Sequence, residues 1–456
     1  MGGEIFQGIF KKRRVLVTGH TGFKGSWLAI WLKELGAEVV GYALEPPSDP
    51  SLFAATGLAD RIDHVHGDVR DLDHLLDVFA RYEPEMVFHL AAQALVRASY
   101  DDPKTTFDTN IGGTVNVLEA VRRTDSVRVL VNITSDKCYE NREWVWGYRE
   151  NDPMGGHDPY SASKGAAELV FAAYLRSFFS RRVFPGVEAR MTGPRAPGIT
   201  DAPAGAEGGD AATGGTGGQL GAASCRAGNA IGGGDWGRDR LIPDCIRALA
   251  AGEDIGIRNP RAIRPWQHVL ELLSGYLWLG ARLWTHPEAF NGGWNFGPRG
   301  EAHMTVGEVV NRLLRAWGSG AWRDLSASGA VHELGMDDEA DRRREAGAVP
   351  AEGTVPAPRA LPALGAIHSP GVAHTPGALH EAATLRLCCD KAAARLGWRN
   401  VLSLDEAIEM TAAWYNTFYS GVSQDAAYHR CTRQIVEYIE KAREKKLKWA
   451  AEKTET

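Results

Sequence analysis

Four polar residues follow the apolar run at residues 127–133, where a buried strand is expected to reach solvent: Thr134, Ser135, Asp136 and Lys137. A carboxyl group beside an amine forms an acid and a base. Such groups can move protons when they lie within hydrogen-bond reach of a substrate. The alternative interpretation is an ordinary polar turn after a strand, and two further motifs favour the chemical one.

Tyr160 and Lys164 lie four residues apart in the segment YSASK. On a helix, residues at this spacing face the same side, so the lysine ammonium could lower the pKa of the tyrosine and leave a phenolate-like base. The spacing alone is common by chance. Its significance lies in its position, because the pair follows both a glycine-rich turn and the polar strand end that contains Asp136.

Gly19, Gly22 and Gly25 form the turn GHTGFKG between a strand-like and a helix-like segment. Glycine permits a tight turn and a close approach of the backbone to a pyrophosphate. The following helix offers free N–H groups and a positive dipole end. The alternative is a glycine-rich turn in an unrelated sheet. The order of strand, turn and helix favours a dinucleotide-binding site.

An acidic residue at the end of the second strand would hold a ribose hydroxyl of the dinucleotide. Residues 38–44 end without aspartate, and Glu45 follows slightly late. Because no arginine or lysine is present there to hold a 2′-phosphate, NAD is favoured over NADP. Asp68 and Val69 end the third strand, where an adenine contact is expected, although Asp68 could instead cap a helix that starts near Asp71.

Strand-like and helix-like segments alternate over residues 14–180, and these elements must position the polar groups. The alternation predicts parallel strands joined by right-handed crossovers, hence an α/β fold with an open doubly wound sheet. Large apolar side chains at three-to-four spacing predict a helix over residues 26–36 that stops at Gly36. The predicted strands are residues 14–19, 38–44, 64–68, 85–92 and 127–133, and the other predicted helices are residues 114–123 and 164–179.

The composition argues against several classes of protein. The net charge of −6 gives no reason to expect nucleic acid as a partner. Neither a signal peptide nor a membrane span is expected, because no apolar stretch is long enough. Six cysteines without a CxxC motif indicate reduced thiols and a cytoplasmic protein. No metal site is expected, and His20 and His89 are predicted to be packing or turn residues.

Two segments depart from the alternating pattern. Residues 186–222 and 319–377 contain few large apolar side chains, so both are predicted to be flexible and to be cut first in limited proteolysis. An error in the coding sequence is the alternative, because structureless loops of this length are unusual inside a domain. The predicted division is a first domain at 1–180, insertions at 181–224 and 319–383, a middle part at 225–318 and a C-terminal helical part at 384–456.

Long stretches of the chain carry a more specific pattern. They read VLVTGHTGFKGSWLAIWLKELGAEVVGYALEPPSDPSLF, HLAAQALVRASY, TNIGGTVNVLEA, TSDKCYENREWVWGYRENDPMGGHDPYSASK, RAGNAIGGGDWGRDRLIPD, RNPRAIRPWQHVLELLSGY and GWNFGP. Together they resemble the extended short-chain dehydrogenases/reductases, and within them the CDP-glucose 4,6-dehydratase branch. The resemblance implies a Rossmann-like NAD-binding domain, a smaller C-terminal α/β lobe for a nucleotide sugar, and a homodimer or homotetramer.

The resemblance also implies roles for individual residues. The catalytic set would be Ser135, Asp136, Lys137, Tyr160 and Lys164. NAD would be held by Gly19, Thr21, Gly22, Phe23, Gly25, Asp68, Val69, Leu90, Ala91, Ala92, Tyr160 and Lys164. The substrate would be held by Gln93, Asn229, Arg240 and Arg264, and Arg226 and Arg258 lie in stretches that resemble diphosphate contacts.

The implied reaction is the NAD-dependent dehydration of CDP-glucose to CDP-4-keto-6-deoxyglucose. Tyr160 would remove the C4 hydroxyl proton as hydride passes to NAD+, and Asp136 would protonate the departing C6 hydroxyl. Hydride would then return to C6. Lys137 is either the base that takes the C5 proton or a charged group that stabilises the enolate. The base role requires burial or nearby cations to lower the pKa of Lys137, because the pKa of a lysine in water is about 10.4.

Three functions remain open from the sequence. The first is the CDP-glucose dehydratase, and the second is a dehydratase or epimerase that acts on another nucleotide sugar. The third is a non-catalytic dinucleotide-binding sensor of the same fold. An epimerase has no need of the acid and base at Asp136 and Lys137, and a sensor has no need of Tyr160 and Lys164, so the first function is preferred.

Overall fold

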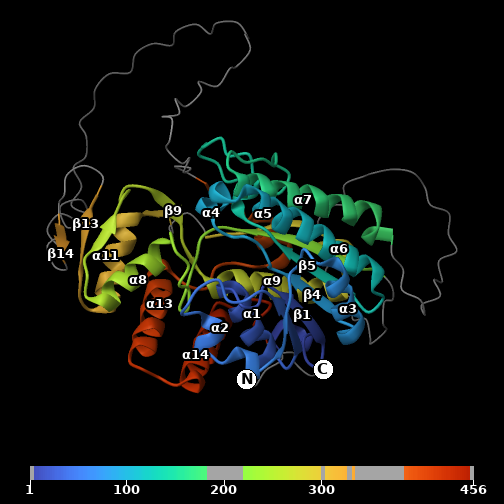
Figure 1. Ribbon diagram of the computed structural model, residues 1–456, viewed down its shortest axis with the longest axis horizontal. Coiled ribbons are helices and arrows are strands. Elements are labelled where there is room, and N and C mark those ends of the chain that lie inside the picture. The colour runs from blue at the N-terminus through green and yellow to red at the C-terminus, as the bar shows by residue number, and fades with distance from the viewer. Residues whose placement is uncertain (1–4, 182–218, 299–302, 326–330, 334–384, 452–456) are drawn as a thin grey trace, which may run out of the picture.

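The computed structural model describes residues 5–181, 219–298, 303–325, 331–333 and 385–451. These residues form two lobes, with the N-terminal elements in one and α8, α11 and β13 in the other (Figure 1). The first lobe contains a seven-stranded sheet in the order β3-β2-β1-β4-β5-β6-β11, in which every pair is parallel. Its strands are β1 (Arg14–Thr18), β2 (Glu38–Ala43), β3 (Asp63–His66), β4 (Met86–His89), β5 (Val129–Ile133), β6 (Gly221–Ala227) and β11 (Gly292–Phe296).

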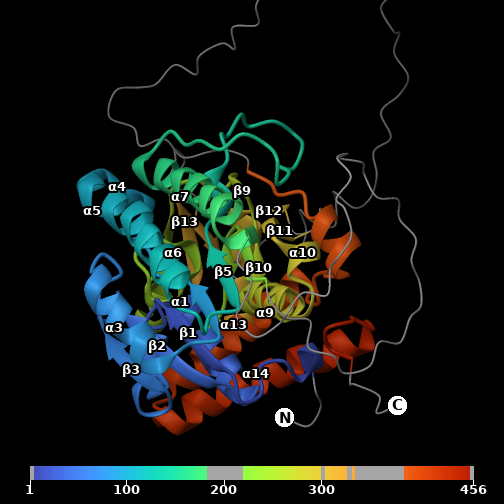
Figure 2. The same cartoon turned by 90° about the vertical axis from the view of Figure 1, so that its right-hand side faces the viewer.

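Helices cover both faces of this sheet, because successive side chains of each buried strand point to opposite faces. In β1, Val15 and Val17 belong to one apolar cluster and Leu16 to the other. The cluster around Leu16 includes side chains of α3 (Leu72–Tyr82), α6 (Gly113–Arg123) and α7 (Pro159–Ser177). The opposite cluster includes α1 (Phe23–Glu34) and α9 (Val269–Thr285). Figure 2 shows α6 and α7 on one side of the strands and α9 on the other. The predicted doubly wound sheet is confirmed.

Two helix boundaries refine the predictions. α1 begins at Phe23, directly after the turn glycine Gly22, so it starts three residues earlier than predicted. It ends before Gly36, whose φ of 80° suits only glycine comfortably. α3 is capped by Asp71, whose side chain accepts a hydrogen bond from His74 N. The alternative in which Asp68 caps this helix is therefore wrong, because Asp71 occupies the capping position.

The predicted insertions extend too far in two places. Residues 221–224 fall in the predicted insertion 181–224, yet they belong to β6, which pairs with both β5 and β11. Residues 321–324 fall in the predicted insertion 319–383, yet they form β13 (Ala321–Asp324), which pairs with β8 (Ile255–Ile257). Small side chains misled the first prediction: a Cβ atom on Gly221 would lie 2.7 Å from the carbonyl oxygen of Leu283 in α9. The remainder of both predicted insertions lies largely outside the described residues.

The second lobe is built from short elements that follow β6. Its strands are β7 (Ala230–Ile231), β8, β9 (Ile263–Pro265), β10 (Gln267–His268), β12 (His303–Thr305), β13 and β14 (Val331–Glu333). Its helices are α8 (Leu241–Ala251), α11 (Val306–Trp317) and α13 (Leu404–Tyr419). The first lobe also contains the short helices α2 (Leu52–Ala55), α4 (Val96–Asp101), α5 (Pro103–Phe107) and α10 (Pro287–Phe290). In the described part of the chain, no helix is long and apolar enough to cross a membrane.

The last helix returns to the start of the chain. α14 (Gln424–Glu444) packs against α1 and α2. The Phe6 ring stacks on Trp449 with centroids 5.1 Å apart, and Phe6 N donates a hydrogen bond to Trp449 O at 2.8 Å. Trp31 of α1 contacts both Trp449 and Tyr438 edge-on. The C-terminal residues therefore complete the core on the α1 face of the sheet.

Candidate active site

The glycine-rich turn between β1 and α1 is closed tightly. Gly19 has a φ of 76°, and a Cβ atom added to it would lie 2.7 Å from Ala91 N. A Cβ atom on Gly25 would lie 2.1 Å from Gly19 O, so the first turn of α1 packs directly on the loop. Thr21 Oγ1 donates to Leu44 O at 2.9 Å and ties the turn to the end of β2. The turn leaves backbone N–H groups at a helix N-terminus, which suits a pyrophosphate.

The end of β4 lies beside this turn, at the point where the strand order reverses. Thr18 Oγ1 accepts hydrogen bonds from the backbone N–H groups of Leu90 and Ala91, both at 3.2 Å. His89 is buried between Thr18 and Thr114 and contacts their hydroxyls at 2.7 and 3.2 Å. Burial, followed by the charge of Lys164, lowers the pKa of His89 to about 3. His89 is thus a neutral packing residue, as predicted, and it fixes the switch point of the sheet.

The polar residues after β5 form a compact turn at the same edge. Ser135 caps a short 3-10 helix, η4 (Asp136–Cys138), and its Oγ accepts from Lys137 N at 3.3 Å and donates to Asp136 Oδ1 at 3.0 Å. Asp136 is buried, with 4% of its surface exposed. A Cβ atom on Gly228 would lie 2.8 Å from Asp136 Oδ2, so the loop after β6 passes directly over the carboxylate. Lys137 is partly buried.

Tyr160 and Lys164 lie in the first turns of α7, as the spacing predicts. Asp158 caps the helix and accepts from Ser161 N at 2.9 Å and Ser161 Oγ at 2.6 Å. Tyr160 is held by Ser99 Oγ, which accepts from its backbone N–H at 3.2 Å. Tyr160 and Lys164 are 7% and 6% exposed. Lys164 Nζ lies 5.9 Å from the centroid of the Tyr160 ring.

Burial shifts the pKa values of the two residues in opposite directions. Burial raises the pKa of Tyr160 to about 12, and a hydrogen bond with Ser135 and the charge of Arg240 oppose this rise. Burial and the charge of Lys24 lower the pKa of Lys164 to about 8, against the opposing influence of Glu168. Ser135 therefore links the strand end to the tyrosine, and the arrangement brings together the catalytic residues predicted from the two motifs.

The sequence motifs did not single out Lys24, which belongs to the glycine-rich turn. It lies in the first turn of α1 and is partly buried. Burial and the charge of Arg240 lower its pKa to about 8, and Asp136 opposes this shift. It also acts on Lys164. The sequence does contain one signal for it: Lys24 is a cation within the motif GHTGFKG, directly before Gly25.

Asn110 is a second residue that the motifs did not identify. It lies in a π-helical turn (Asp108–Gly112) and connects three parts of the site. Its Nδ2 donates to Ser163 Oγ of α7 at 2.8 Å and to Gln93 O at 3.0 Å, and its Oδ1 accepts from Gln93 N at 2.8 Å. π-helical turns are rare and are often found at functional sites. Gln93 itself uses its side chain to hold Leu95 and Thr106.

Arginines of the second lobe approach the same edge. Arg240 Nη1 pairs with Asp235 Oδ2 at 2.9 Å, and Arg240 is close enough to Tyr160 to lower its pKa. Arg97 of α4 and Arg258 of the second lobe both face Asp239 Oδ1, at 3.1 and 3.8 Å. Asp239 therefore brings together one arginine from each lobe. Guanidinium groups placed in this way can also pair with the phosphate oxygens of a ligand between the lobes.

Asn229 and Arg264 lie in the segments that join this region. Asn229 follows Gly228, which passes over Asp136, and Asn229 O accepts from Gln267 N at 3.3 Å. Arg264 belongs to β9 and its Nη1 donates to Ile263 O at 3.0 Å. Phe23 lies against Gly232, 3.2 Å from the position of an added Cβ atom. Asn229 and Arg264 therefore lie on the second-lobe side of the site, and Phe23 of α1 approaches that side from the first lobe.

Some predicted residues have other partners. Arg226 was a candidate for a diphosphate contact, but it is buried in β6 and pairs with Glu168 Oε2 at 2.8 Å. That assignment is wrong, because its guanidinium is paired inside the fold.

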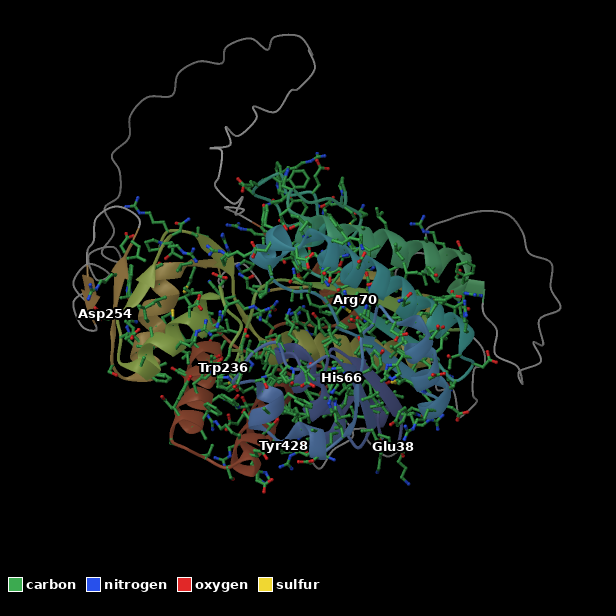
Figure 3. All side chains as sticks on the ribbon, in the orientation of Figure 1. Glu38, His66, Arg70, Trp236, Asp254 and Tyr428 are labelled. Atoms are coloured by element: carbon green, nitrogen blue, oxygen red, sulfur yellow. The ribbon has the colours of Figure 1, made fainter. Side chains whose placement is uncertain are left out.

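The predicted adenine contacts lie after β3. Asp68 pairs with Arg70, and Val69 packs against Gly113. Figure 3 shows Arg70 and His66 over the first lobe and Asp254 at the outer edge of the second. The contact of Asp68 and Val69 with adenine stays a prediction.

Comparisons with known proteins agree with this architecture. The family model for GDP-mannose 4,6 dehydratase matches residues 16–189. A CDP-glucose 4,6-dehydratase from Salmonella typhimurium is 48% identical over 329 residues, which cover 72% of this chain and 83% of that protein. A dTDP-glucose 4,6-dehydratase from Mycolicibacterium smegmatis is 33% identical over 168 residues, which cover 36% of this chain and 50% of that protein.

Solved structures share the fold. A dTDP-glucose 4,6-dehydratase from Bacillus anthracis, in complex with NAD, has a TM-score of 0.59 at 16% identity and covers 89% of this chain and 96% of its own. A UDP-glucose 4-epimerase from Thermotoga maritima, with UDP-glucose, has a TM-score of 0.59 at 18% identity and covers 88% of this chain and 98% of its own. The long match at 48% identity decides the family. The chain belongs to the CDP-glucose 4,6-dehydratase family of extended short-chain dehydrogenases/reductases.

Proposed function

We propose that the protein is an NAD-dependent dehydratase that converts CDP-glucose to CDP-4-keto-6-deoxyglucose. The observation that carries the proposal is the pairing of two sets of groups at one sheet edge. Ser135 connects the Asp136-Lys137 turn to Tyr160, in a chain that is 48% identical to a CDP-glucose 4,6-dehydratase. An epimerase would need only the tyrosine and lysine pair.

The residues of the turn fit a bound NAD molecule. The protein's own backbone occupies the space that Cβ atoms would fill at Gly19 and Gly25, so glycine is needed there to close the turn. A turn of this kind before a helix presents backbone N–H groups to a pyrophosphate. Gly22 and the N–H groups of the first turn of α1 would hold the phosphates, and Leu90, Ala91 and Ala92 would line the switch point. Lys164 would contact the ribose beside the nicotinamide. Bound NAD+ supplies the acceptor and later the donor of one hydride.

Each proton transfer is assigned to a residue of this chain. Tyr160 takes the proton of the C4 hydroxyl as the C4 hydride leaves, which gives a 4-keto sugar. The ketone acidifies the C5 proton, which passes to Lys137. Asp136 donates a proton to the C6 hydroxyl, which leaves as water. The hydride then enters at C6 as Lys137 returns its proton to C5. Through solvent, Tyr160 gives up the proton it took and Asp136 regains the one it gave, so both the cofactor and the protein are unchanged over the cycle.

The substrate grip falls to the arginines between the lobes. Arg240 is oriented by Asp235, and Arg264 and Asn229 lie on the same side. An arginine fork matches phosphate oxygens in two-point contacts. We expect these residues to hold the diphosphate of the nucleotide sugar, so that C4, C5 and C6 face Tyr160, Lys137 and Asp136.

The proposal is tested by incubating the protein with CDP-, dTDP-, UDP- and GDP-glucose and measuring the alkali-induced absorbance of a 4-keto sugar. We expect the signal with CDP-glucose at a rate well above the other three. Signal with a different nucleotide sugar alone would reassign the substrate, and no signal with any of them would reject the dehydratase.

A Tyr160→Phe variant is the matched control, since it removes one hydroxyl. It should bind NAD with an affinity like that of the unaltered protein and should form neither NADH nor 4-keto sugar. Substantial turnover by this variant would remove Tyr160 from the mechanism.

A further inference from the structure

Glu168 and Arg226 form an ion pair inside the first lobe. Arg226 Nη2 donates to Glu168 Oε2 at 2.8 Å, and the two side chains are 6% and 3% exposed. Removing two charges from water is costly, and a buried pair is often no more stable than apolar residues of the same volume. The proposed reaction assigns neither residue a role. Their presence therefore requires an explanation other than stability alone.

The pair connects both sides of the catalytic strand end to α7. Glu168 accepts hydrogen bonds from Thr134 Oγ1, which directly precedes Ser135, and from Ser224 Oγ at 2.6 Å. Arg226 Nη1 donates to Tyr139 OH at 2.7 Å, directly after η4. Residues on either side of the Ser135-Asp136-Lys137 turn are thus held by one pair of opposite charges.

Glu168 also lies one helical turn beyond Lys164. Tyr160, Lys164 and Glu168 are spaced by four residues along α7, so they share one face of the helix. The carboxylate raises the pKa of Lys164, and it opposes burial and the charge of Lys24, which together lower that pKa to about 8. Arg226 keeps this carboxylate in place, because it supplies a charged partner inside the protein.

We propose that Glu168 is a positioning residue for Lys164: held by Arg226, it places a carboxylate one helical turn from the lysine and fixes α7 against the turn that carries Asp136. The proposal rests on the proposed function only for the contact of Lys164 with NAD. The buried pair of Glu168 and Arg226 would then control the charge of Lys164.

The test compares NAD binding by the full chain and by a Glu168→Gln variant, with calorimetry between pH 6.5 and 9.5. Glutamine keeps the size of the side chain and a carbonyl acceptor for Thr134, but it removes the charge. NAD affinity should fall as Lys164 loses its proton. In the variant the midpoint of this fall should move to lower pH by about one unit, the order expected for one charge in a protein interior. Enzyme-bound NADH formation from CDP-glucose should show the same displacement.

A second variant guards against a failure to fold. Glu168→Gln alone leaves Arg226 buried without its charged partner, which is strongly destabilising in other proteins. The double variant Glu168→Gln with Arg226→Met removes both charges and should fold. Its midpoint should move in the same direction but by less, because the loss of the Arg226 cation partly offsets the loss of the carboxylate.

Glu271→Gln is the matched control. Glu271 is a buried carboxylate of α9 that accepts hydrogen bonds from Val401 N and from Tyr438 OH, and it is not among the charged groups that shift the pKa of Lys164. This variant should keep the midpoint of the unaltered protein.

If the folded variants keep the midpoint of the unaltered protein, the proposal is overturned. If they also lose stability, the ion pair of Glu168 and Arg226 has only a structural role. The arm that measures NAD affinity does not need a substrate. If the unaltered protein binds NAD but forms no NADH with CDP-glucose, the proposed function fails while the positioning role is still decided.

Discussion

The pKa of Lys164 depends on charged residues from two different helices, Lys24 of α1 and Glu168 of α7. Lys24 and burial lower its pKa to about 8, and Glu168 raises it. Two of these influences come from residues that can be changed without touching Tyr160. The balance between them sets the pH range in which the lysine is an ammonium. If Lys164 contacts NAD as proposed, that range bounds NAD binding.

Removing the charge of Lys24 should act in the opposite direction from removing that of Glu168. In a Lys24→Met variant the repulsion disappears, so the pKa of Lys164 rises and the ammonium persists to higher pH. We expect the alkaline limb of NADH formation to move upward by about one pH unit. Lys33→Met, in the last turn of the same helix, should leave the limb in place. A downward displacement in the Lys24 variant would show that its charge does not reach Lys164.

Lys137 distinguishes two accounts of the elimination. If it is the C5 base, Lys137→Ala should still form NADH and a 4-keto-glucose species from CDP-glucose. It should not exchange the C5 proton with solvent deuterium. Lys137→Glu should recover part of the dehydration, since a carboxylate can also take the proton. If a charged lysine only stabilises the enolate, the glutamate variant should be slower than the alanine variant, because it adds negative charge beside a developing anion. Mass spectrometry of the sugar measures the exchange.

At the scale of elements, α7 carries the tyrosine and lysine on a helix whose start is fixed by one carboxylate. Asp158 accepts two hydrogen bonds from Ser161, and Pro159 occupies the first turn. Asp158→Ala should lower the free energy of unfolding by about 1 kcal/mol, as other lost N-caps do. It should also lower kcat, because the first turn holds Tyr160. Ser423→Ala, which removes the N-cap of α14, should cost similar stability and leave kcat unchanged.

The elements differ in how far their sequences reveal them. Strong apolar runs predict β1 and β5 close to their observed bounds, because both faces of these strands are buried under large side chains. β4 is also predicted, but it ends three residues earlier than the predicted 85–92. β6 is equally buried, yet its small residues read as a flexible segment. The close approach of α9 at Gly221 explains those small residues, and no local pattern contains that information.

The residues of the candidate site also differ in how far the sequence reveals them. Tyr160, Asp136 and the turn glycines could be predicted, because each belongs to a motif whose spacing is set by one strand or helix. Asn110 could not, because its partner Ser163 is far away in the sequence. Lys24 is visible in the glycine motif, but the charges that act on it, Arg240 and Asp136, are not. Arg226 was misassigned for a related reason: its partner Glu168 lies on α7, and only the folded chain brings the two charges together.

At the scale of the whole molecule, the first lobe depends on residues from both ends of the described chain. Trp449 is 1% exposed and contacts Phe6, Trp31 and Tyr438. Trp449→Ala should lower the free energy of unfolding by roughly 3–5 kcal/mol, as expected for a large aromatic side chain removed from a core. Denaturant unfolding measures this loss. Trp146→Ala, at a position that is 69% exposed, should lose much less. Equal losses in the two variants would contradict the packing described for Trp449.

The contact between Phe6 and Trp449 also bears on how the protein is made. The ribosome produces Phe6 and Trp31 early, but the residues that cover them come after residue 424. Until then the nascent chain presents indole and phenyl rings to its surroundings, and these rings are the kind of surface that chaperones bind and that aggregates grow from. Translation that stops before α14 would therefore yield a chain with every catalytic residue in its sequence and no closed core to hold them.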